Sequence, residues 1–326
     1  MTAKPLLEVE NLRIDLALGN KKFAAVQDVS FTIGHGETLG LVGESGCGKS
    51  ITALALIGLL RDPLAIGGGT IRFDGREIQS LSASEMRKLR GNRISMIFQE
   101  PMTALNPLSP VGRQIAEMFV LHKGASWREA ERLAVEALAS VRVPAPDRRV
   151  EDYPHQLSGG MRQRVMIAIA LACGPDLLLA DEPTTALDVT VQAEILDLIR
   201  DLSAAKGTAV LMISHDLGLI ANMCRRVGVM YAGKLVEERA AEDVFRAPSH
   251  PYTSGLVASL PLLGARARHG RQRLKEISGV VPPVAAFPTG CRFNPRCYAA
   301  SDICRANDPA ATPLNSGGFV RCHHHE

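Results

Sequence analysis

The pattern of apolar and polar positions changes along the chain, and the changes mark its expected elements. Runs rich in Val, Ile, Leu and Phe cover residues 6–16, 23–33, 38–42 and 70–78, with Gly, Asn and Asp turn signals between them. These runs predict a sheet near the N-terminus. From about residue 100 to 172 the pattern becomes mainly helical, and Ser126 with Glu129 forms a predicted capping box before apolar residues at helical spacing.

Strand-like runs return at residues 176–180, 209–214 and 227–231, and helical patterns such as residues 191–202 alternate with them. This alternation is typical of a parallel α/β sheet, so the helical block is predicted to be an insertion into one α/β domain. After residue 259 the composition changes to a basic stretch, then a Pro-rich segment and then a group of cysteines. We predict a main domain over residues 1–264 and a C-terminal extension over residues 265–326.

Composition and apolar run lengths bear on the partners and the location of the protein, although charge alone decides neither. With 37 Lys and Arg against 34 Asp and Glu, the net charge of +3 gives no strong basic field, and the basic stretch lacks aromatic residues to stack bases, so a nucleic-acid partner is not expected. The longest mainly apolar run, residues 51–60, is about half of the roughly 20 residues that cross a bilayer. No N-terminal signal segment is recognisable. We therefore expect the protein to stay in the cytosol.

One loop carries a phosphate-binding pattern. It follows the apolar run 38–42, precedes a helical run over residues 50–60, and reads Gly43-Glu44-Ser45-Gly46-Cys47-Gly48-Lys49-Ser50. Its glycines let backbone N–H groups face phosphate oxygens at a helix N-terminus. Lys49 is predicted to reach the β and γ phosphates, and Ser50 to offer a hydroxyl to Mg²⁺. Cys47 is expected to be present as a small residue and not as a reactive thiol. The same surroundings would lower the pKa of its thiol, so that accidental alkylation could block ATP.

A second apolar strand, residues 177–180, ends in adjacent carboxylates at Asp181 and Glu182. Ligands of parallel α/β sheets bind at the carboxyl ends of the strands. Asp181 suits Mg²⁺, directly or through water, and Glu182 suits orienting or deprotonating the water that attacks a γ-phosphate.

The segment Leu157-Ser158-Gly159-Gly160-Met161 resembles the signature motif of the ABC ATPases. Its Ser158 would cap a helix that runs to about residue 172, and Gly159 and Gly160 would let phosphate approach. The resemblance implies a P-loop NTPase fold of the ABC type: an α/β fold with an N-terminal antiparallel β region, a mainly parallel core sheet, an inserted helical subdomain and a small C-terminal extension. Residues 1–264 would then be the nucleotide-binding domain.

Further residues match the family's motifs in order. The resemblance implies that Gln99 senses Mg²⁺ and the attacking water, that Asp188 couples paired sites across a dimer, and that His215 contacts the γ-phosphate. Phe23 is the nearby candidate for stacking on adenine, although core packing explains it equally well. Because the family's signature faces nucleotide on another subunit, the resemblance also implies two cassettes that close over two ATP molecules.

Within the ABC group, nearly the whole chain is similar to the oligopeptide and dipeptide importer ATPases. Residues 98–107, 157–164 and 250–253 carry this similarity, and they resemble the first of two ATPase paralogues. The resemblance implies a heterodimer with the second paralogue, or a homodimer. It further implies two membrane permease subunits, an indirect extracytoplasmic solute-binding protein, and a place on the cytoplasmic face of the inner or plasma membrane. The expected cargo is peptide; nickel, glutathione and other small solutes stay open, and a non-transport cytosolic ABC ATPase is a more distant alternative.

The tail holds four of the seven cysteines: Cys291, Cys297, Cys304 and Cys322. In a reducing cytosol such a set indicates metal ligands more readily than disulfides. Spacings of five, six and seventeen residues fit no common zinc finger. A [4Fe-4S] cluster on four thiolates is therefore one hypothesis, and free or structural cysteines are the other.

Overall fold

The chain forms two compact units. The computed structural model describes residues 4–100, 104–185, 187–260 and 276–325. The first unit comprises residues up to 6, 33–37 and 74–212, and the second comprises residues 7–32, 38–73 and those from 213 onward. The predicted domain boundary at residues 264 and 265 lies outside the described residues, as do Pro101, Met102 and Thr103 of the importer-like segment.

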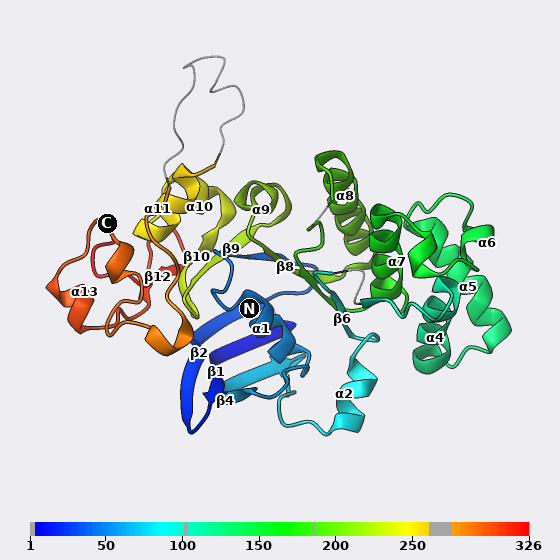
Figure 1. The fold of residues 1–326 in the computed structure, drawn as a ribbon, viewed down its shortest axis with the longest axis horizontal. Coiled ribbons are helices and arrows are strands. Elements are labelled where there is room, and N and C mark those ends of the chain that lie inside the picture. The colour runs from blue at the N-terminus through cyan, green and yellow to red at the C-terminus, as the bar shows by residue number, and fades with distance from the viewer. Residues whose placement is uncertain (1–3, 101–103, 186, 261–275, 326) are drawn as a thin grey trace, which may run out of the picture. The chain divides into compact units, whose positions relative to one another are not determined.

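The second unit contains an antiparallel sheet and part of a mixed one (Figure 1). The antiparallel order is β2-β1-β4, formed by Leu7–Leu18 (β1), Lys21–Ile33 (β2) and Leu64–Phe73 (β4). The mixed order is β11-β12-β10-β9-β3, formed by Thr312–Pro313, Phe319–Val320, Lys234–Ala240, Arg226–Tyr231 and Thr38–Val42. Strand β9 pairs parallel with β3 and antiparallel with β10, so the unit is α/β with an antiparallel β region, as predicted.

The helices of the second unit are short. They comprise Lys49–Leu56 (α1), Leu217–Met223 (α9), Ala241–Arg246 (α10), Pro251–Ala258 (α11) and Asp302–Ala306 (α13), with 3-10 turns at Val284–Ala286 and Asn294–Arg296. Helix α1 follows β3 through the phosphate-loop pattern, as the sequence predicted.

The first unit combines buried strands with a helical group. Strands β8 (Ala209–Ser214), β7 (Leu177–Asp181) and β6 (Ile94–Ile97) lie in the order β8-β7-β6, and β6 pairs parallel with β7. Every residue of these three strands is buried. Strands buried on both faces have continuous apolar runs instead of alternation, which is why the sequence pattern located them closely.

The predicted helical block is confirmed. Helices α4, α5, α6 and α7 gather in one group (Figure 1), with bounds Val111–Lys123, Trp127–Ser140, Pro146–Arg149 and Gly159–Leu171. The unit also contains α2 (Ala83–Leu89), the 3-10 turn Pro154–Gln156, α8 (Val189–Lys206) and the short strand β5 (Arg76–Glu77).

Two local predictions were wrong in part. The run 70–78 is not one strand, because Asp74 and Gly75 take positive φ angles of 52° and 74° and turn the chain after β4. At α5, the Ser126 hydroxyl accepts from the Glu129 N–H, but the Glu129 carboxylate binds Arg132 at 2.6 Å, so the capping box is half formed. A complete box joins Ser82 and Glu85 at α2.

Strand β10 is the longest strand that the sequence pattern missed. Its residues Lys234, Glu237, Glu238 and Arg239 are all buried. Their charges interrupt the apolar pattern, and each has an ion-pair partner: Lys234 binds Asp308, Glu238 binds Arg226, and Arg239 lies 3.6 Å from Glu237. Buried charges are tolerated where partners compensate the lost hydration, so β10 depends on these partners.

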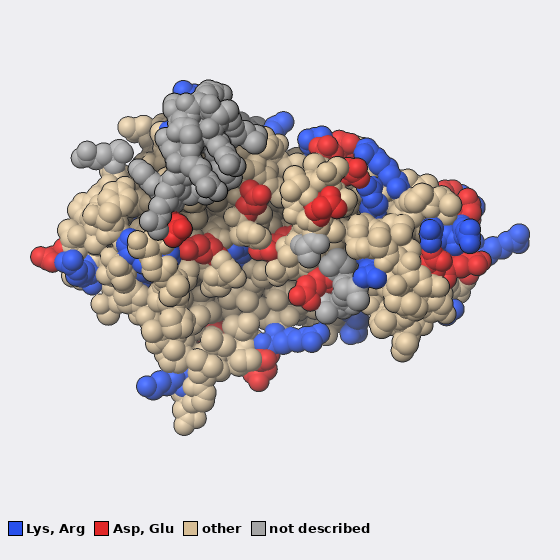
Figure 2. All heavy atoms as spheres, turned by 45° about the horizontal axis from the view of Figure 1, so that its top comes forward, with Lys and Arg blue, Asp and Glu red and all other residues tan. Residues whose placement is uncertain are grey.

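No helix among the described residues is long and apolar enough to span a bilayer. On the face shown in Figure 2, basic and acidic side chains are interspersed.

Candidate nucleotide site

The phosphate loop depends on glycine backbone geometry. Gly43 has φ 152°, and a Cβ atom built there would lie 2.2 Å from the Met230 carbonyl oxygen. Gly48 has φ 109° and caps α1 without any side-chain hydrogen bond. Because glycine has no side chain, the N-cap residue itself leaves the helix start open to a ligand, which is the usual arrangement for anion binding.

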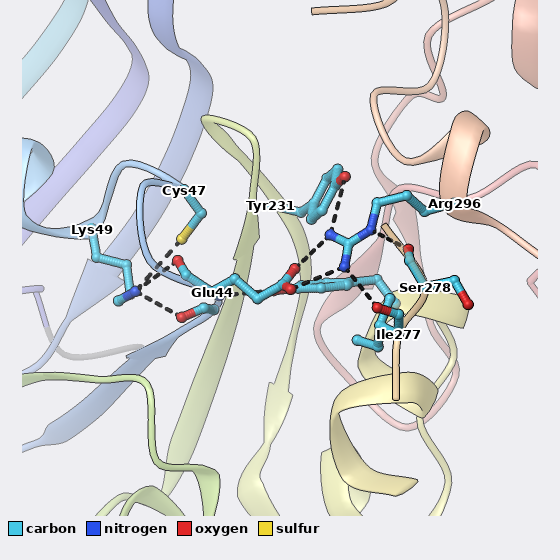
Figure 3. Close-up of polar contacts among 9 residues, drawn as sticks. Glu44, Cys47, Lys49, Tyr231, Ile277, Ser278 and Arg296 are labelled. Atoms are coloured by element: carbon cyan, nitrogen blue, oxygen red, sulfur yellow. Dashed lines mark hydrogen bonds and ion pairs between the residues drawn. The ribbon is translucent and has the colours of Figure 1, made fainter. Parts of the chain in front are cut away.

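Lys49 is folded back onto this loop. Its side chain is buried, and Nζ donates to the carbonyl oxygens of Gly43 at 2.7 Å and Glu44 at 3.1 Å (Figure 3). The ammonium thus lies within the curve of the loop, where a phosphate would compete for its protons. Ser50 follows it in the first turn of α1. A lysine and a hydroxyl at the start of one helix supply a cation for phosphate and a hard oxygen ligand for Mg²⁺.

Cys47 is the small buried residue that was expected, but the predicted lowering of its thiol pKa was wrong. The thiol is fully buried, and burial raises its pKa, although Lys49 acts in the opposite direction. A protonated thiol that solvent does not reach is a poor nucleophile. Cys47 is a small residue packed under the loop.

In the first unit, β7 presents the two predicted acids. Asp181 ends the strand and is buried. Glu182 follows with φ 46°, and its Oε2 accepts from Gln99 Nε2 at 3.1 Å and from Thr185 Oγ1 at 2.9 Å. The structure thus brings Gln99 and Glu182 together across 83 residues of sequence. A carboxylate held by two donors has a fixed direction, as the orientation of an attacking water requires.

Two glutamines that the sequence reading missed fix the turn after Glu182. Gln163, buried on α7, donates to the Pro183 carbonyl oxygen. Gln192 on α8 donates to the Thr184 oxygen at 3.1 Å. The spacing of these residues gives no sign of the contact, but Gln163 lies within the 157–164 segment already singled out.

The signature segment starts a helix, as predicted. The Ser158 hydroxyl caps α7 by accepting from the Met161 N–H at 3.4 Å. A Cβ at Gly160 would lie 3.1 Å from a Val191 methyl group, so glycine allows α7 to approach α8. Asp188 caps α8 by accepting from the Val191 N–H at 3.0 Å. The signature start and Asp188 therefore lie at neighbouring helix starts, with Gly159 beside Leu187.

The other candidates lie in the second unit. His215 directly follows β8 and is exposed, and its neighbour Asp216 caps α9. Phe23 on β2 is half-buried and lines a cavity of about 470 Å³, whose wall includes Lys22, Lys234 and Arg292. This wall adjoins the phosphate loop, because the Gly233 N–H donates to the Cys47 carbonyl oxygen at 2.8 Å.

The tail cysteines lie in neighbouring segments. The Cys291 N–H donates to the Cys304 carbonyl oxygen at 2.8 Å, and Ser301, which precedes Cys304, bonds His324 beside Cys322. Burial raises the pKa of the Cys291 thiol to about 11 and also raises those of Cys297 and Cys322. Metal ligation would have to displace these protons. Among the described residues, no three His, Cys, Asp or Glu side chains are arranged to hold a metal ion, so the geometry does not by itself form a metal centre.

Comparison with known proteins finds a match for the nucleotide-binding region and another for the C-terminal region. A family model described as "ABC transporter" matches residues 26–185, and one described as "Oligopeptide/dipeptide transporter, C-terminal region" matches residues 236–304. The oligopeptide transport ATP-binding protein OppD of Salmonella typhimurium is 49% identical over 98% of this chain and 94% of its own length. The chain belongs to the ABC transporter ATP-binding proteins. AppD of Bacillus subtilis, with the same description, is 47% identical over 97% of this chain and 96% of its own length.

A solved ABC cassette shows the same fold. The cassette MJ0796, in a dimeric post-hydrolysis state with ADP and Pi, has a TM-score of 0.65 and 28% identity, and the match covers 72% of this chain and 98% of that one. This ABC protein is therefore an ATPase subunit with the α/β cassette fold predicted from its motifs. Cassettes of the family dimerise and work with membrane permease subunits.

Proposed function

We propose that this ABC protein hydrolyses ATP to drive uptake of oligopeptides or dipeptides through membrane permease partners. The observation that carries the proposal is the presence in one chain of a complete phosphate loop and a C-terminal region of the oligopeptide/dipeptide type. Relatives that match this chain over 94–96% of their own length carry the name of oligopeptide transport ATP-binding proteins.

The residues divide the chemistry of hydrolysis. Lys49 and the loop N–H groups bind the β and γ phosphates, and His215 contacts the γ-phosphate. Ser50 would offer Mg²⁺ its hydroxyl, Asp181 its carboxylate and Gln99 its amide oxygen, because Mg²⁺ is a hard cation that takes oxygen ligands. Glu182 orients the attacking water and takes its proton while the bond to the leaving ADP breaks.

Two cassettes complete two sites in this proposal. Ser158, Gly159 and Gly160 offer a capped helix start to the ATP of a partner subunit, and Asp188 at the neighbouring helix start couples the two sites. The partner is a paralogous ATPase, or else a second copy of this chain. Two permease subunits at the cytoplasmic face of the membrane receive the motion of closure, and an extracytoplasmic solute-binding protein delivers the cargo.

Reconstitution tests the cargo. The chain is assembled in vesicles with its permeases and second ATPase, and ATP hydrolysis is measured with the solute-binding protein and a mixture of short peptides. We expect peptides to stimulate hydrolysis several-fold, while nickel and glutathione do not. If only nickel or glutathione stimulates hydrolysis, that solute takes the place of peptide as the proposed substrate.

Phe23 is proposed to stack on adenine. Support comes from its place on the wall of a cavity that adjoins the phosphate loop. Stacking on one base is worth roughly 1–3 kcal/mol, so Phe23→Ala should weaken ATP binding about tenfold and Phe23→Trp should restore it. Equal affinity of both variants and the wild type would return Phe23 to a packing role.

We also propose a [4Fe-4S] cluster on Cys291, Cys297, Cys304 and Cys322. Support comes from hydrogen bonds that join the segments carrying these cysteines. Anaerobic purification followed by iron analysis and visible absorbance tests it. Protein that carries no iron and no visible absorbance refutes the cluster and leaves four structural thiols.

A further inference from the structure

The C-terminal extension contacts the phosphate loop through an ion pair between Arg296 and Glu44. Both guanidinium ends of Arg296 meet the Glu44 carboxylate, Nη1 to Oε2 at 2.7 Å and Nη2 to Oε1 at 3.0 Å (Figure 3). The two residues are 252 positions apart in sequence. The Arg296 side chain is 5% exposed and that of Glu44 is 32% exposed, so solvent reaches the pair from the loop side only. A bidentate Arg–carboxylate pair fixes direction as well as distance.

Arg296 is itself rigidly held by the extension. Its Nε donates to the Ser278 carbonyl oxygen at 2.8 Å, and Nη2 also donates to the Ile277 oxygen at 3.2 Å. The guanidinium carbon lies 5.6 Å from the centre of the Tyr231 ring. These contacts leave the arginine little rotamer freedom, so it acts on Glu44 as a fixed anchor.

Every polar part of Glu44 is engaged. Its N–H donates to the hydroxyl of buried Tyr252 at 2.9 Å, its carbonyl oxygen accepts from Lys49 Nζ at 3.1 Å, and its carboxylate is bound by Arg296. The residue that follows Gly43 in the loop is thus connected directly to the lysine that binds phosphate. Any displacement of the Glu44 backbone displaces an oxygen that Lys49 uses.

We infer that Arg296 is a positioning residue for nucleotide binding: through Glu44 it holds the phosphate loop in the conformation that accepts the triphosphate. The extension is then a working part of the ATP site. A loop without this anchor samples more conformations. The apparent affinity for ATP then falls in proportion to the population of the conformation that can bind it. The effect falls on ATP affinity and KM more than on kcat, because Arg296 contacts no reacting atom. This inference rests on the loop binding ATP.

A double-mutant cycle in the full chain tests the anchor. Mg-ADP affinity by calorimetry and the KM and kcat of ATP hydrolysis are measured for wild type, Glu44→Gln, Arg296→Met and the double variant. Each single change should weaken nucleotide binding about tenfold with kcat changed less than threefold. The double variant should also lose about tenfold, because the two changes remove one interaction. A hundredfold loss in the double variant, or no loss in either single variant, overturns the inference.

Two further variants control the cycle. Arg305→Met removes an exposed arginine of the same extension that pairs only locally with Asp302, at 2.7 Å, and should bind nucleotide like wild type. The exchanged pair Glu44→Arg with Arg296→Glu should recover part of the lost affinity. If Arg296→Met does not fold, Glu44→Gln still decides the matter, since it leaves the extension's own contacts in place. Wild-type protein that binds no nucleotide refutes the ATPase assignment instead, which keeps the two failures distinct.

Discussion

The phosphate loop and the C-terminal extension are built on opposite principles, although Glu44 and Arg296 join them. The loop is local: eight consecutive residues specify its shape, and its glycines hold positive φ angles. The extension has little regular structure and is held by long-range contacts to the buried charges of β10. A motif in sequence therefore marks the first region, whereas only partners distant in sequence explain the second. The same contrast holds for Asp181 and Glu182 at the end of β7, which adjacent residues mark, and for the charges of β10, which depend on distant partners.

The largest expected effect is the loss of turnover when Glu182, the acid that follows β7, is replaced. Glu182→Gln keeps the shape of the side chain but removes the proton acceptor, so kcat should fall by roughly 10²–10⁴-fold, while ATP affinity stays within about threefold. The measurement is single-turnover hydrolysis alongside equilibrium ATP binding. Glu194→Gln, an exposed acid bound to Arg164 on the same unit, is the matched control and should hydrolyse normally. Near-normal turnover of Glu182→Gln would mean that another group takes the proton.

The dependence of the loop on its glycines is tested by two alanines. At Gly43 a Cβ would strike the Met230 carbonyl oxygen at 2.2 Å, whereas at Gly46, φ 79°, it meets nothing within 4 Å. Gly46→Ala should lower the free energy of unfolding by only about 1–2 kcal/mol, because alanine must adopt the left-handed backbone conformation there. Gly43→Ala should cost more than that and abolish ATP binding, because the loop must open. Thermal unfolding and ATP titration measure both, and equal losses would contradict the geometric account.

The buried charges of β10, which hold the extension, are tested at Glu237. This fully buried carboxylate accepts from the N–H groups of Ser249 and His250, both at 2.9 Å. Glu237→Gln places an amide against one of these donors and should lower the free energy of unfolding by about 1–3 kcal/mol. The exposed pair of Glu242 with Arg246 supplies the control Glu242→Gln, which should change stability by less than about 0.5 kcal/mol. Urea denaturation compares them, and an equally small loss at Glu237 would show that β10 tolerates an unpaired group.

The smallest effect near neutral pH concerns His250. Burial lowers its pKa to about 3, and its neutral Nδ1 accepts from the Tyr252 N–H at 3.0 Å. The unfolded chain binds a proton at this residue below about pH 6.5, so the stability it contributes is present above that pH and is lost progressively as the pH falls toward 3.

Between pH 7.5 and 5.5 this loss is about 1 kcal/mol. His250→Asn, which keeps an acceptor at the helix start but cannot titrate, should remove that part of the slope in urea melts. An unchanged slope would assign the acid sensitivity to other groups.

Much of the fold was predictable where burial is continuous or a turn is specified locally. Strands β3 and β8 match the predicted runs at both ends, and Ser158 caps a helix that reaches Leu171. Two of the failures share one cause. Glu129 was predicted to complete a capping box and β10 was not predicted at all, because a charged side chain has several partners to choose from and its spacing in sequence does not select one.

The sequence by itself determined the phosphate loop, the acids after β7, the signature helix start and the family, because each depends on a few adjacent residues whose backbone or side-chain chemistry has few alternatives. Only the tertiary structure decided that Gln99 meets Glu182, that Cys47 is buried and inert, and that Arg296 holds Glu44. Those facts depend on which distant segments pack together, and packing is set by the whole core rather than by any one stretch of the chain.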